Sequence, residues 1–309
     1  MNDDYGNRLQ TVLAYIEANL HSPLNLDELA EASHFSKYHF ARLFSALQGQ
    51  APMAYVTERR LVRALDYLNK TDKTMLDIAS LCGFGSLSRF NAAFKKRYEA
   101  TPSQMRRKLR QPSNFRQADG KIREETASME SYDESSNNHR DFLRRVWGMN
   151  IDVTELPSYH VAYVTHVGSY LDTYKAWGTL GAWAQQHRLF PPEQQFIGVS
   201  LDDPSLVDEY ACRYEACVTL PEALLAAGSG DPNVAFQTLP GGLYARYTFY
   251  DTIDKFALAY QSVYGGWLPR SGYEPDDRHA LEFSLNNPAS DPEGKARVDL
   301  YVPIRRMGG

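Results

Sequence analysis

Residues 29–44, LAEASHFSKYHFARLF, and residues 78–94, IASLCGFGSLSRFNAAF, are two copies of one pattern. The apolar positions of the first copy recur 49 residues later, and after the inserted Gly85 the offset becomes 50. The matched pairs are Leu29 with Ile78, Ala30 with Ala79, Phe35 with Phe84, Ser36 with Ser86, Phe40 with Phe90, Phe44 with Phe94 and Pro52 with Pro102. Each copy is typical of a short helix, a tight turn and a capped helix, which is the helix-turn-helix pattern.

Helical periodicity surrounds both copies. An amphipathic first helix is predicted from the three-four spacing of Leu9, Val12, Leu13, Ile16 and Leu20. A short helix is expected over residues 26–32, followed by a third helix that Ser36 caps, with Phe40, Leu43, Phe44 and Leu47 on its inner face.

The segment between the copies, residues 52–69, is predicted to be one long helix with Leu61, Ala64, Leu65 and Leu68 turned inward. About 18 residues at 1.5 Å rise give a rod of roughly 27 Å. Such a rod could hold two recognition helices near one DNA turn apart, about 34 Å. A helical bundle without any ligand is the alternative that this pattern alone leaves open.

Composition and charge set wider limits. The 309 residues suggest two domains. No stretch reaches the roughly 20 apolar residues of a membrane span, and the acidic start MNDDYGNRLQ is unlike a secretory signal. The three cysteines form no tight pair, which argues against a disulfide framework or a zinc site and favours buried free thiols. We therefore expect a cytoplasmic protein without membrane contact, metal or cofactor.

The net charge of −5 conceals an asymmetry between the two halves. Residues 1–110 carry 16 Lys and Arg against 11 Asp and Glu, whereas the remainder carries 17 against 27. Between Ser86 and Arg110, eight basic residues face the single acid Glu99: Arg89, Lys95, Lys96, Arg97, Arg106, Arg107, Lys108 and Arg110. A charge run is usually a solvated face, but beside a duplicated helix-turn-helix it favours double-stranded DNA as the partner.

The first 110 residues resemble the AraC/XylS-type DNA-binding domain. The likeness covers about residues 5–110 and is carried by LDELAEASHFSKYHFARLFSALQGQAPMAYVTERRL and DIASLCGFGSLSRFNAAFKKRYEATPSQMRR, most specifically by GFGSLSRFNAAFKKRY followed by TPSQMRR. This resemblance implies a sequence-specific regulator, commonly an activator that contacts RNA polymerase.

Helical geometry selects the side chains that would face DNA. On the third helix the outer positions are Lys37, Tyr38, Ala41, Arg42 and Ser45. Arg42 can donate two hydrogen bonds to one guanine, and Tyr38 can pack on thymine methyl groups or contact a phosphate. The resemblance to the AraC/XylS-type domain points to the same helix face. On the second copy the candidates are Leu87, Ser88, Arg89, Asn91, Lys95 and Lys96. Similar proteins often carry Arg at position 92 and a polar residue at 87, so the lysines suit phosphate contacts better than base reading.

The chain changes character after residue 110. Residues 111–149 are polar and are interpreted as a linker, with a short helix near residues 140–147. Beyond it, period-two alternation predicts strands over 151–155, 159–167, 196–202, 210–219, 235–239, 243–250, 279–285 and 298–304, with helices over 170–187 and 252–264. The expected fold is therefore an all-α double helix-turn-helix domain, residues 1–110, followed by an α+β domain, residues 150–309, with two strand-strand-helix-strand-strand repeats.

All four tryptophans and 14 of the 20 tyrosines lie after residue 110. Aromatic residues usually fill a core, but an acidic, aromatic-rich domain also suits apolar or cationic small molecules. This half resembles the GyrI-like effector-binding domain over about residues 150–306. The resemblance is carried, in order, by ELPSYHVAYVTHVGSYLDTYKAW, FIGVSLDDP, EYACRYEACVTL, LPGGLYARYTFYDT, HALEFSLNNP and VDLYVPIRR.

The resemblance implies a groove on a pseudo-two-fold axis that binds hydrophobic, often cationic compounds, with the family's glutamate at Glu282. The residues alone are ambiguous, because Leu281, Phe283 and Leu285 share one face and Glu282 points to the other, as a surface residue would. We expect the groove to be lined by Glu282 and six aromatic residues: Tyr163, Tyr170, Trp177, Tyr214, Tyr247 and Trp267. In the second repeat, FYDTI, residues 249–253, stands where similar proteins often have a glycine-containing turn like HVGSY, residues 166–170 of the first repeat.

Three functions remain open at this stage. The first is a transcription regulator that responds to a small-molecule effector. The second is a GyrI-like hydrolase fused to a DNA-binding domain, although the sequence shows no nucleophile-histidine-acid set or phosphate loop, and no catalytic residue is assigned. The third is a C-terminal module that docks another protein.

Overall fold

The computed structural model describes residues 3–110, 151–204, 206–226 and 228–307. The described residues fall into two compact units. We call residues 3–110 the N-terminal domain and residues 151–307 the C-terminal domain. The linker expected over residues 111–149, and the short helix near 140–147 within it, lie outside the described residues.

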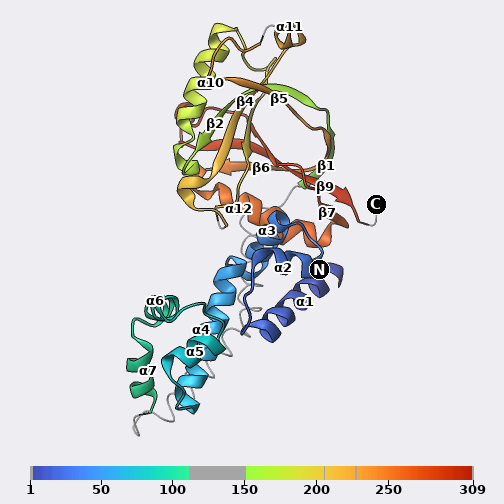
Figure 1. Ribbon diagram of the computed structural model, residues 1–309. Coiled ribbons are helices and arrows are strands. Elements are labelled where there is room, and N and C mark those ends of the chain that lie inside the picture. The colour runs from blue at the N-terminus through green and yellow to red at the C-terminus, as the bar shows by residue number, and fades with distance from the viewer. Residues whose placement is uncertain (1–2, 111–150, 205, 227, 308–309) are drawn as a thin grey trace. The chain divides into compact units, whose positions relative to one another are not determined.

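The N-terminal domain is entirely helical in its described residues (Figure 1). Its helices are α1 (Asp3–Asn19), α2 (Leu26–Ser33), α3 (Lys37–Gln48), α4 (Pro52–Lys70), α5 (Met75–Leu81), α6 (Leu87–Tyr98) and α7 (Pro102–Leu109). The first, second, third and long linking helices expected from the sequence are all present. Helices α2 and α3 form the first helix-turn-helix unit, and α5 and α6 form the second.

The two units begin with the same local chemistry. Asn25 accepts the backbone N–H of Glu28 at 3.0 Å, and Thr74 accepts that of Asp77 at 3.1 Å, so both short helices start with a capping box. Such a cap satisfies backbone donors that the first helical turn leaves unpaired. Ser36 stands at the N-cap position of α3 as expected, but among the described residues its side chain makes no capping bond, whereas Ser86 accepts the N–H of Arg89 at 3.2 Å.

Two hydrophobic cores share the long helix α4. The first core packs the front of α4, at Tyr55 and Val56, against α1, α2 and α3, with Phe40 and Phe44 at its centre. The second core packs the rear of α4 against α5, α6 and α7 through Leu61, Ala64, Leu65, Leu68, Ile78, Ala79, Phe90 and Phe94. Each half of α4 therefore contributes to a different core, the front half through Tyr55 and Val56 and the rear half from Leu61 onward.

The C-terminal domain is built around one antiparallel sheet. Its main strands are β1 (Ile151–Leu156), β2 (Tyr159–Val167), β3 (Phe196–Ser200), β4 (Arg213–Thr219), β5 (Ala235–Leu239), β6 (Gly242–Asp251), β8 (Leu281–Ser284) and β9 (Ala296–Arg306). Helix α10 (Tyr174–Gln186) follows β2 and α12 (Phe256–Gln261) follows β6. The small elements are α11 (Glu222–Leu225) and β7 (Tyr273–Pro275). The chain order therefore contains the predicted strand-strand-helix-strand-strand repeat twice.

The strand order in the sheet is β1-β6-β9-β8-β3-β4-β2-β5, with β7 beside β9. This order is symmetric about the β8–β3 junction, because β3, β4, β2 and β5 take the places of β8, β9, β6 and β1. Each repeat gives its first strand to the other: β1 pairs with β6 and β5 pairs with β2. The two repeats therefore form one continuous sheet with Glu282 and Gly198 opposite each other at the axis.

Both faces of the sheet are covered by apolar packing. Helix α10 packs on β2 and β4, and α12 packs on β6, along what we call the helix face (Figure 1). The other face, which we call the open face, carries a second cluster that includes Val161, Ile197, Cys217, Leu281 and Phe283. The three cysteines are free and buried, as the sequence predicted.

Several boundaries differ from the sequence predictions, and three of them are informative. The strand expected over 210–219 begins only at Arg213, because Asp208 accepts the N–H of Tyr210 at 2.9 Å and turns residues 209–211 into a 3₁₀ helix. The helix expected over 252–264 opens with a 3₁₀ turn at Ile253–Lys255. Beyond α12 it continues as a π-helical turn, Ser262–Trp267, and a 3₁₀ turn, Leu268–Arg270. The strand expected over 196–202 ends at Ser200.

Candidate DNA interface and effector site

Helix α3 carries the five side chains that the sequence assigned to DNA. Lys37, Tyr38, Ala41, Arg42 and Ser45 lie on α3, and Phe40 and Phe44 of the same helix belong to the first core. Lys37 is exposed and Tyr38 and Ser45 are partly exposed, but Ala41 and Arg42 are buried, so the prediction of an outward-facing position is wrong for these two residues in this structure. The guanidinium carbon of Arg42 lies 4.5 Å from the ring centroid of Tyr38, one turn earlier. This stacking couples the two side chains to each other.

Lys37 has a partner at the start of the preceding helix. Its Nζ lies 2.9 Å from Oδ2 of Asp27, and both side chains are exposed. An exposed ion pair of this kind contributes little stability and is screened by salt. A DNA phosphate could therefore take the place of Asp27 at little cost.

Helix α6 presents a more strongly basic face. Ser88, Arg89, Asn91, Lys95 and Lys96 are exposed along it. Leu87 differs from the sequence prediction, because it is only partly exposed and packs against the second core. A leucine held in this way contributes packing, and the polar residues that follow it remain available to a duplex.

Part of the basic cluster serves internal contacts that sequence reasoning missed. Arg106 donates to the carbonyl of Lys73 at 2.6 Å, and Arg110 donates to Asp72 at 2.6 Å. The hydrogen bond from Arg110 lowers the pKa of Asp72. These two arginines fasten α7 to the turn before α5, which leaves the α6 lysines and Arg89 as the clearer phosphate-binding candidates.

Glu282 lies on the helix face of the sheet, at the pseudo-two-fold axis. It stands opposite Gly198 on β3 and Leu300 on β9, and residues directly opposite in antiparallel strands share a face. Its side chain is only 7% exposed. The interpretation of Glu282 as a surface residue is therefore wrong, because both faces of β8 are buried.

Hydroxyl groups from both repeats hold the Glu282 carboxylate. Ser200 donates to Oε1 at 2.8 Å and Tyr260, on α12, donates to the same oxygen at 2.7 Å. The hydroxyl of Tyr214 also hydrogen-bonds to Glu282, and it receives a further hydrogen bond from Trp177. Burial, followed by the negative charge of Glu282, raises the pKa of Tyr214 well above its usual value.

The glycine opposite Glu282 makes this cluster possible. A Cβ at Gly198 would lie 2.0 Å from the Tyr214 hydroxyl and 2.9 Å from Oε2 of Glu282. A real side chain cannot approach so closely, so only glycine lets the phenol and the carboxylate meet above β3. Sequence reasoning missed Gly198, Ser200 and Tyr260, although the alternation of FIGVS, residues 196–200, places Phe196, Gly198 and Ser200 on one face.

Three of the six expected aromatic residues gather beside Glu282. The ring of Tyr214 lies 5.8 Å from that of Tyr170 and 6.3 Å from that of Trp177. The hydroxyl of Tyr170 lies 2.8 Å from the carbonyl oxygen of Asp202 and accepts the N–H of that residue at 3.1 Å, so it also fastens the loop between β3 and β4. These rings and the carboxylate form the cluster that we call the Glu282 site.

The other three expected aromatic residues lie elsewhere. Tyr247 is on the helix face but is separated from Glu282 by β9, since it stands opposite Leu300. Tyr163 packs in the apolar cluster of the open face, because its strand parity is that of Val161. Trp267 stacks on Tyr273 of β7, which pairs with Arg306 near the far end of β9. Tyr163 and Trp267 therefore do not gather with Glu282 in this structure, and their assignment as lining residues stays a prediction.

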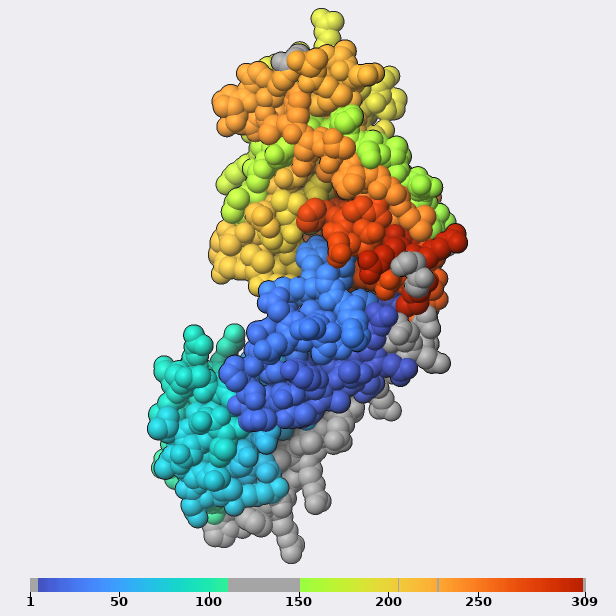
Figure 2. Space-filling view, turned by 45° about the vertical axis from the view of Figure 1, so that its right-hand side comes forward, coloured from blue at the N-terminus to red at the C-terminus, as the bar shows by residue number. Residues whose placement is uncertain are grey.

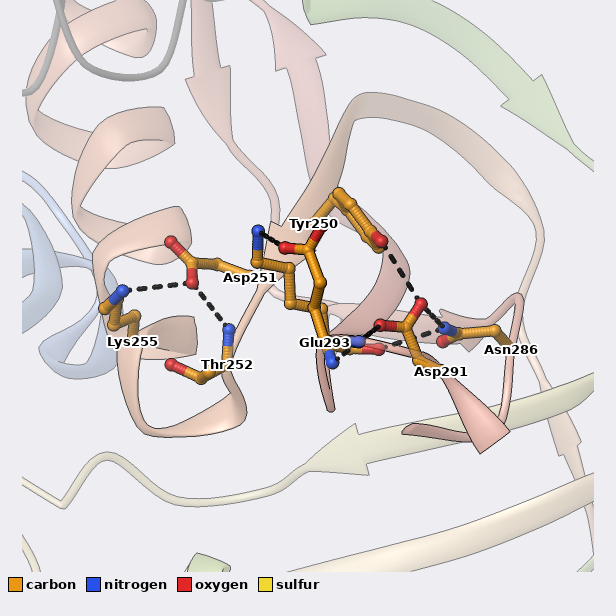
Figure 3. A network of polar contacts seen from close by, with 8 residues as sticks. Tyr250, Asp251, Thr252, Lys255, Asn286, Asp291 and Glu293 are labelled. Atoms are coloured by element: carbon orange, nitrogen blue, oxygen red, sulfur yellow. Dashed lines mark hydrogen bonds and ion pairs between the residues drawn. The ribbon is translucent and has the colours of Figure 1, made fainter. Parts of the chain in front are cut away.

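The second repeat fastens its hairpin loop with a different tyrosine (Figure 3). Tyr250, at the end of β6, donates to Asp291 at 3.1 Å, and Asp291 in turn accepts the N–H groups of Glu293 and Lys295. In place of the glycine turn of the first repeat, Asp251 accepts the N–H of Thr252 at 2.8 Å. The departure noted in FYDTI is thus a side-chain-supported turn that keeps the loop between β8 and β9 close to β6.

Among the residues that the structure describes, no three or more His, Cys, Asp or Glu side chains are placed to hold a metal ion. No described helix is both long and apolar enough to span a bilayer.

Comparison with known proteins finds family matches in both domains. Residues 149–305 match the family described as a GyrI-like small molecule binding domain, and residues 29–108 match a helix-turn-helix domain family. Transcriptional regulator Rob of Salmonella typhimurium is 36% identical over 104 residues, covering 34% of this chain and 36% of Rob. Regulatory protein SoxS of the same organism is 33% identical over 101 residues, covering 33% of this chain and 94% of SoxS.

The match to Rob thus spans only about a third of that protein's length, while the match to SoxS spans nearly all of it. Among solved structures, the DNA-binding domain of the transcriptional factor AdpA, in complex with a target DNA, is similar. It has a TM-score of 0.33 and 27% identity, and the match covers 33% of this chain and 92% of that chain.

Proposed function

The chain belongs to the AraC-type helix-turn-helix regulators that carry a GyrI-like small molecule binding domain, and on that premise we propose that it switches transcription in response to a lipophilic cation. In this proposal α3 and α6 bind DNA and the Glu282 site binds the effector. The observation that carries the DNA part is the pair of helix-turn-helix units built on one helix, α4, with an exposed basic face on α6.

We propose different tasks for the two recognition helices. The stacked pair Tyr38 and Arg42 suits base reading, because a guanidinium offers two parallel donors to guanine. Lys95 and Lys96 suit phosphate contact, which adds affinity without much sequence information. The first unit then sets most of the sequence preference and the second unit most of the salt dependence.

The effector part of the proposal rests on a carboxylate buried among rings. Burying a negative charge is costly unless donors or a cation compensate it, and three hydroxyls compensate Glu282 in this structure. A flat lipophilic cation would bring an opposite charge to the carboxylate. The ring of Trp177 would offer it apolar area and quadrupole attraction. The exchange of hydroxyls for a cation is therefore the proposed binding event.

A substitution that removes the charge of Glu282 tests the effector part of the proposal. Glu282→Gln keeps the shape of the side chain and removes its charge. In titrations followed by tryptophan fluorescence, we expect the affinity for a cationic dye such as rhodamine 6G to fall about tenfold or more. The affinity for a neutral dye of similar size should change little. Equal losses for both dyes would mean that Glu282 supports the fold and does not recognise charge.

Transcription assays address the direction of regulation. We propose that the regulator is an activator that contacts RNA polymerase, as the resemblance of the N-terminal domain implies. Adding the full-length protein to RNA polymerase on a promoter that carries a selected binding site should raise transcript yield. A drop in yield would instead identify a repressor. Recovery of the intact dye by mass spectrometry after incubation separates a sensor from a hydrolase.

A further inference from the structure

The joint between the two helix-turn-helix units is polar. On α4, Val56 is the last residue in the first core and Leu61 begins the second core. The four residues between them are Thr57, Glu58, Arg59 and Arg60. A single helix crossing between two cores can bend, so the relative position of α3 and α6 depends on what these residues contact. Figure 2 shows the two units as adjoining lobes, the first in blue and the second in cyan to green.

Arg60 reaches back to the end of α1. Its Nε donates to the carbonyl of Leu20 at 3.0 Å, and its Nη2 donates to the carbonyl of Ser22 at 2.6 Å. Both carbonyls follow directly after α1, where a helix leaves acceptors unpaired and a positive charge is favourable. The guanidinium is thus a fork that joins α4 to the turn between α1 and α2.

Gly83, in the turn between α5 and α6, meets the same two groups. A Cβ on Gly83 would lie 2.1 Å from the oxygen of Leu20 and 2.9 Å from Nε and Nη2 of Arg60. The equivalent residue of the first unit is His34, which also has a positive φ, 56°, but carries a side chain into solvent. Glycine at position 83 is therefore required by a close contact with the first unit, in addition to its φ of +76°.

We propose that Arg60 and Gly83 lock the two helix-turn-helix units together, so that the protein selects operators by the spacing of their two half-sites. The lock consists of the Arg60 fork on Leu20 and Ser22 and of the Gly83 backbone seated against it. Arg60 is a positioning residue in this role, since it would act on DNA only through α3 and α6. The consequence for spacing rests on the proposed DNA-binding function.

Other polar links at the joint are weaker or stay within one unit. Glu58 accepts from Gln50 at 3.3 Å and from Arg97 at 3.2 Å, but the Arg97 side chain is exposed and such pairs are readily screened. Arg59, also at the joint, pairs with Glu17 of α1, which belongs to the first unit. Arg59→Gln is therefore the control for Arg60, with the same loss of charge on the same helix.

Distance measurement without DNA tests the lock itself. Spin labels on Glu31→Cys and Ser80→Cys would occupy equivalent exposed positions of α2 and α5 in the full-length protein, and the three native thiols are buried. We expect one narrow distance distribution for the parent and for Arg59→Gln, and a broader or shifted one for Arg60→Met. Arg60→Lys keeps the positive charge but cannot form the two-pronged contact, so the width of its distance distribution should lie between those of the parent and Arg60→Met. This variant also tests the lock if Arg60→Met does not fold. Gly83→Ala should shift the mean distance. Unchanged distributions in the Arg60 variants and in Gly83→Ala would overturn the lock.

Spacing variants of a DNA site test its consequence. A site selected from random duplexes with the full-length protein is lengthened or shortened by one base pair between its half-sites. We expect the parent and Arg59→Gln to lose about tenfold or more in affinity on the altered sites, and Arg60→Met to lose much less. If Arg60→Met binds the selected, the lengthened and the shortened duplex each more weakly than the parent by the same factor, Arg60 has a structural role only. Absence of salt-dependent DNA binding by the parent would refute the proposed function, while the spin-label distances would still decide the lock.

Discussion

The hydroxyl of Tyr260, on α12, lies 2.7 Å from Oε1 of Glu282, on β8. The same oxygen accepts the hydroxyl of Ser200, which belongs to the first repeat. One carboxylate oxygen is thus bonded from both sides of the pseudo-two-fold axis. If the proposed effector reaches Oε1 from the helix face, it displaces at least one of these hydroxyls, so under the proposed function these hydrogen bonds compete with binding.

This competition predicts that Tyr260→Phe tightens the binding of a cationic dye. The substitution removes one hydrogen bond to a charged group, worth about 1.5 kcal/mol, which corresponds to roughly tenfold in affinity. The unliganded domain should also melt at a lower temperature. Tyr163→Phe, on the open face, is the control and should leave affinity unchanged. If Tyr260→Phe changes neither the fluorescence titration nor the melting temperature, the hydroxyl has no part in the site.

Gly198→Ala should disrupt the Glu282 site from the opposite strand. The added Cβ would overlap the Tyr214 hydroxyl, so the phenol or the β3 backbone must move, at a cost of about 1–3 kcal/mol. Gly181→Ala in α10 is the matched control, because its Cβ would meet no atom within 4 Å and alanine favours a helix. Chemical denaturation of both variants checks this expectation, and equal stability for the two would contradict it.

Two substitutions should separate base reading from phosphate contact. Arg42→Ala is expected to cost about 1–3 kcal/mol on a selected site and to relax its sequence preference. Lys95→Ala should weaken binding to all duplexes to a similar extent and flatten the dependence of affinity on salt. Fluorescence anisotropy at several salt concentrations measures both effects. A uniform loss for Arg42→Ala would remove that residue from base reading.

The Asp202–Arg213 pair should make the C-terminal domain sensitive to acid. Arg213 donates to Asp202 through Nε at 2.8 Å and Nη2 at 2.9 Å, and this hydrogen bonding lowers the pKa of the carboxyl. Because the folded-state pKa is lower than the unfolded one, the stabilisation is present above the unfolded pKa and is lost as pH falls through the folded pKa. Asp202→Asn should therefore lower the free energy of unfolding at neutral pH. That free energy should also fall less steeply in the variant than in the parent as the pH drops.

Urea unfolding followed by tryptophan fluorescence between pH 3 and 7, a range set about the ordinary carboxyl pKa near 3.9, measures that pH dependence. Glu222→Gln, at an exposed position of α11, controls for the loss of one negative charge. Parallel pH profiles for the parent and Asp202→Asn would show that the pair does not stabilise the fold.

The sequence predicted those elements whose signal is local. The repeat offset located α2, α3, α5 and α6, and period-two alternation located the main strands, because both depend on neighbouring side chains. The partner of β1 could not be inferred in this way, since its pairing with β6 joins residues about 90 positions apart. The π-helical turn after α12 and the three-residue β7 are too short to leave a periodic signal.

The same distinction applies to the Glu282 site. Glu282, Trp177 and Tyr214 were expected from resemblance and aromatic content, and the structure brings them together. Ser200 and Tyr260 were missed, because their nearness to Glu282 follows from the β3–β8 pairing and from the packing of α12. Tyr163 lies on the face opposite Glu282, since strand parity fixes which residues share a side but not which side carries Glu282.

The exchange of first strands between the repeats bears on the order in which the chain can fold during synthesis. Strand β1 follows the linker directly, yet its partner β6 comes only at residues 242–251, and β6 is itself flanked by β9, at residues 296–306. The helices of the N-terminal domain, in contrast, contact near neighbours along the chain, a pattern that favours rapid folding. The N-terminal domain can therefore assemble while the C-terminal domain is still being translated. Any chain cut short before β9 would leave β6 and β8 with unpaired edges that invite aggregation.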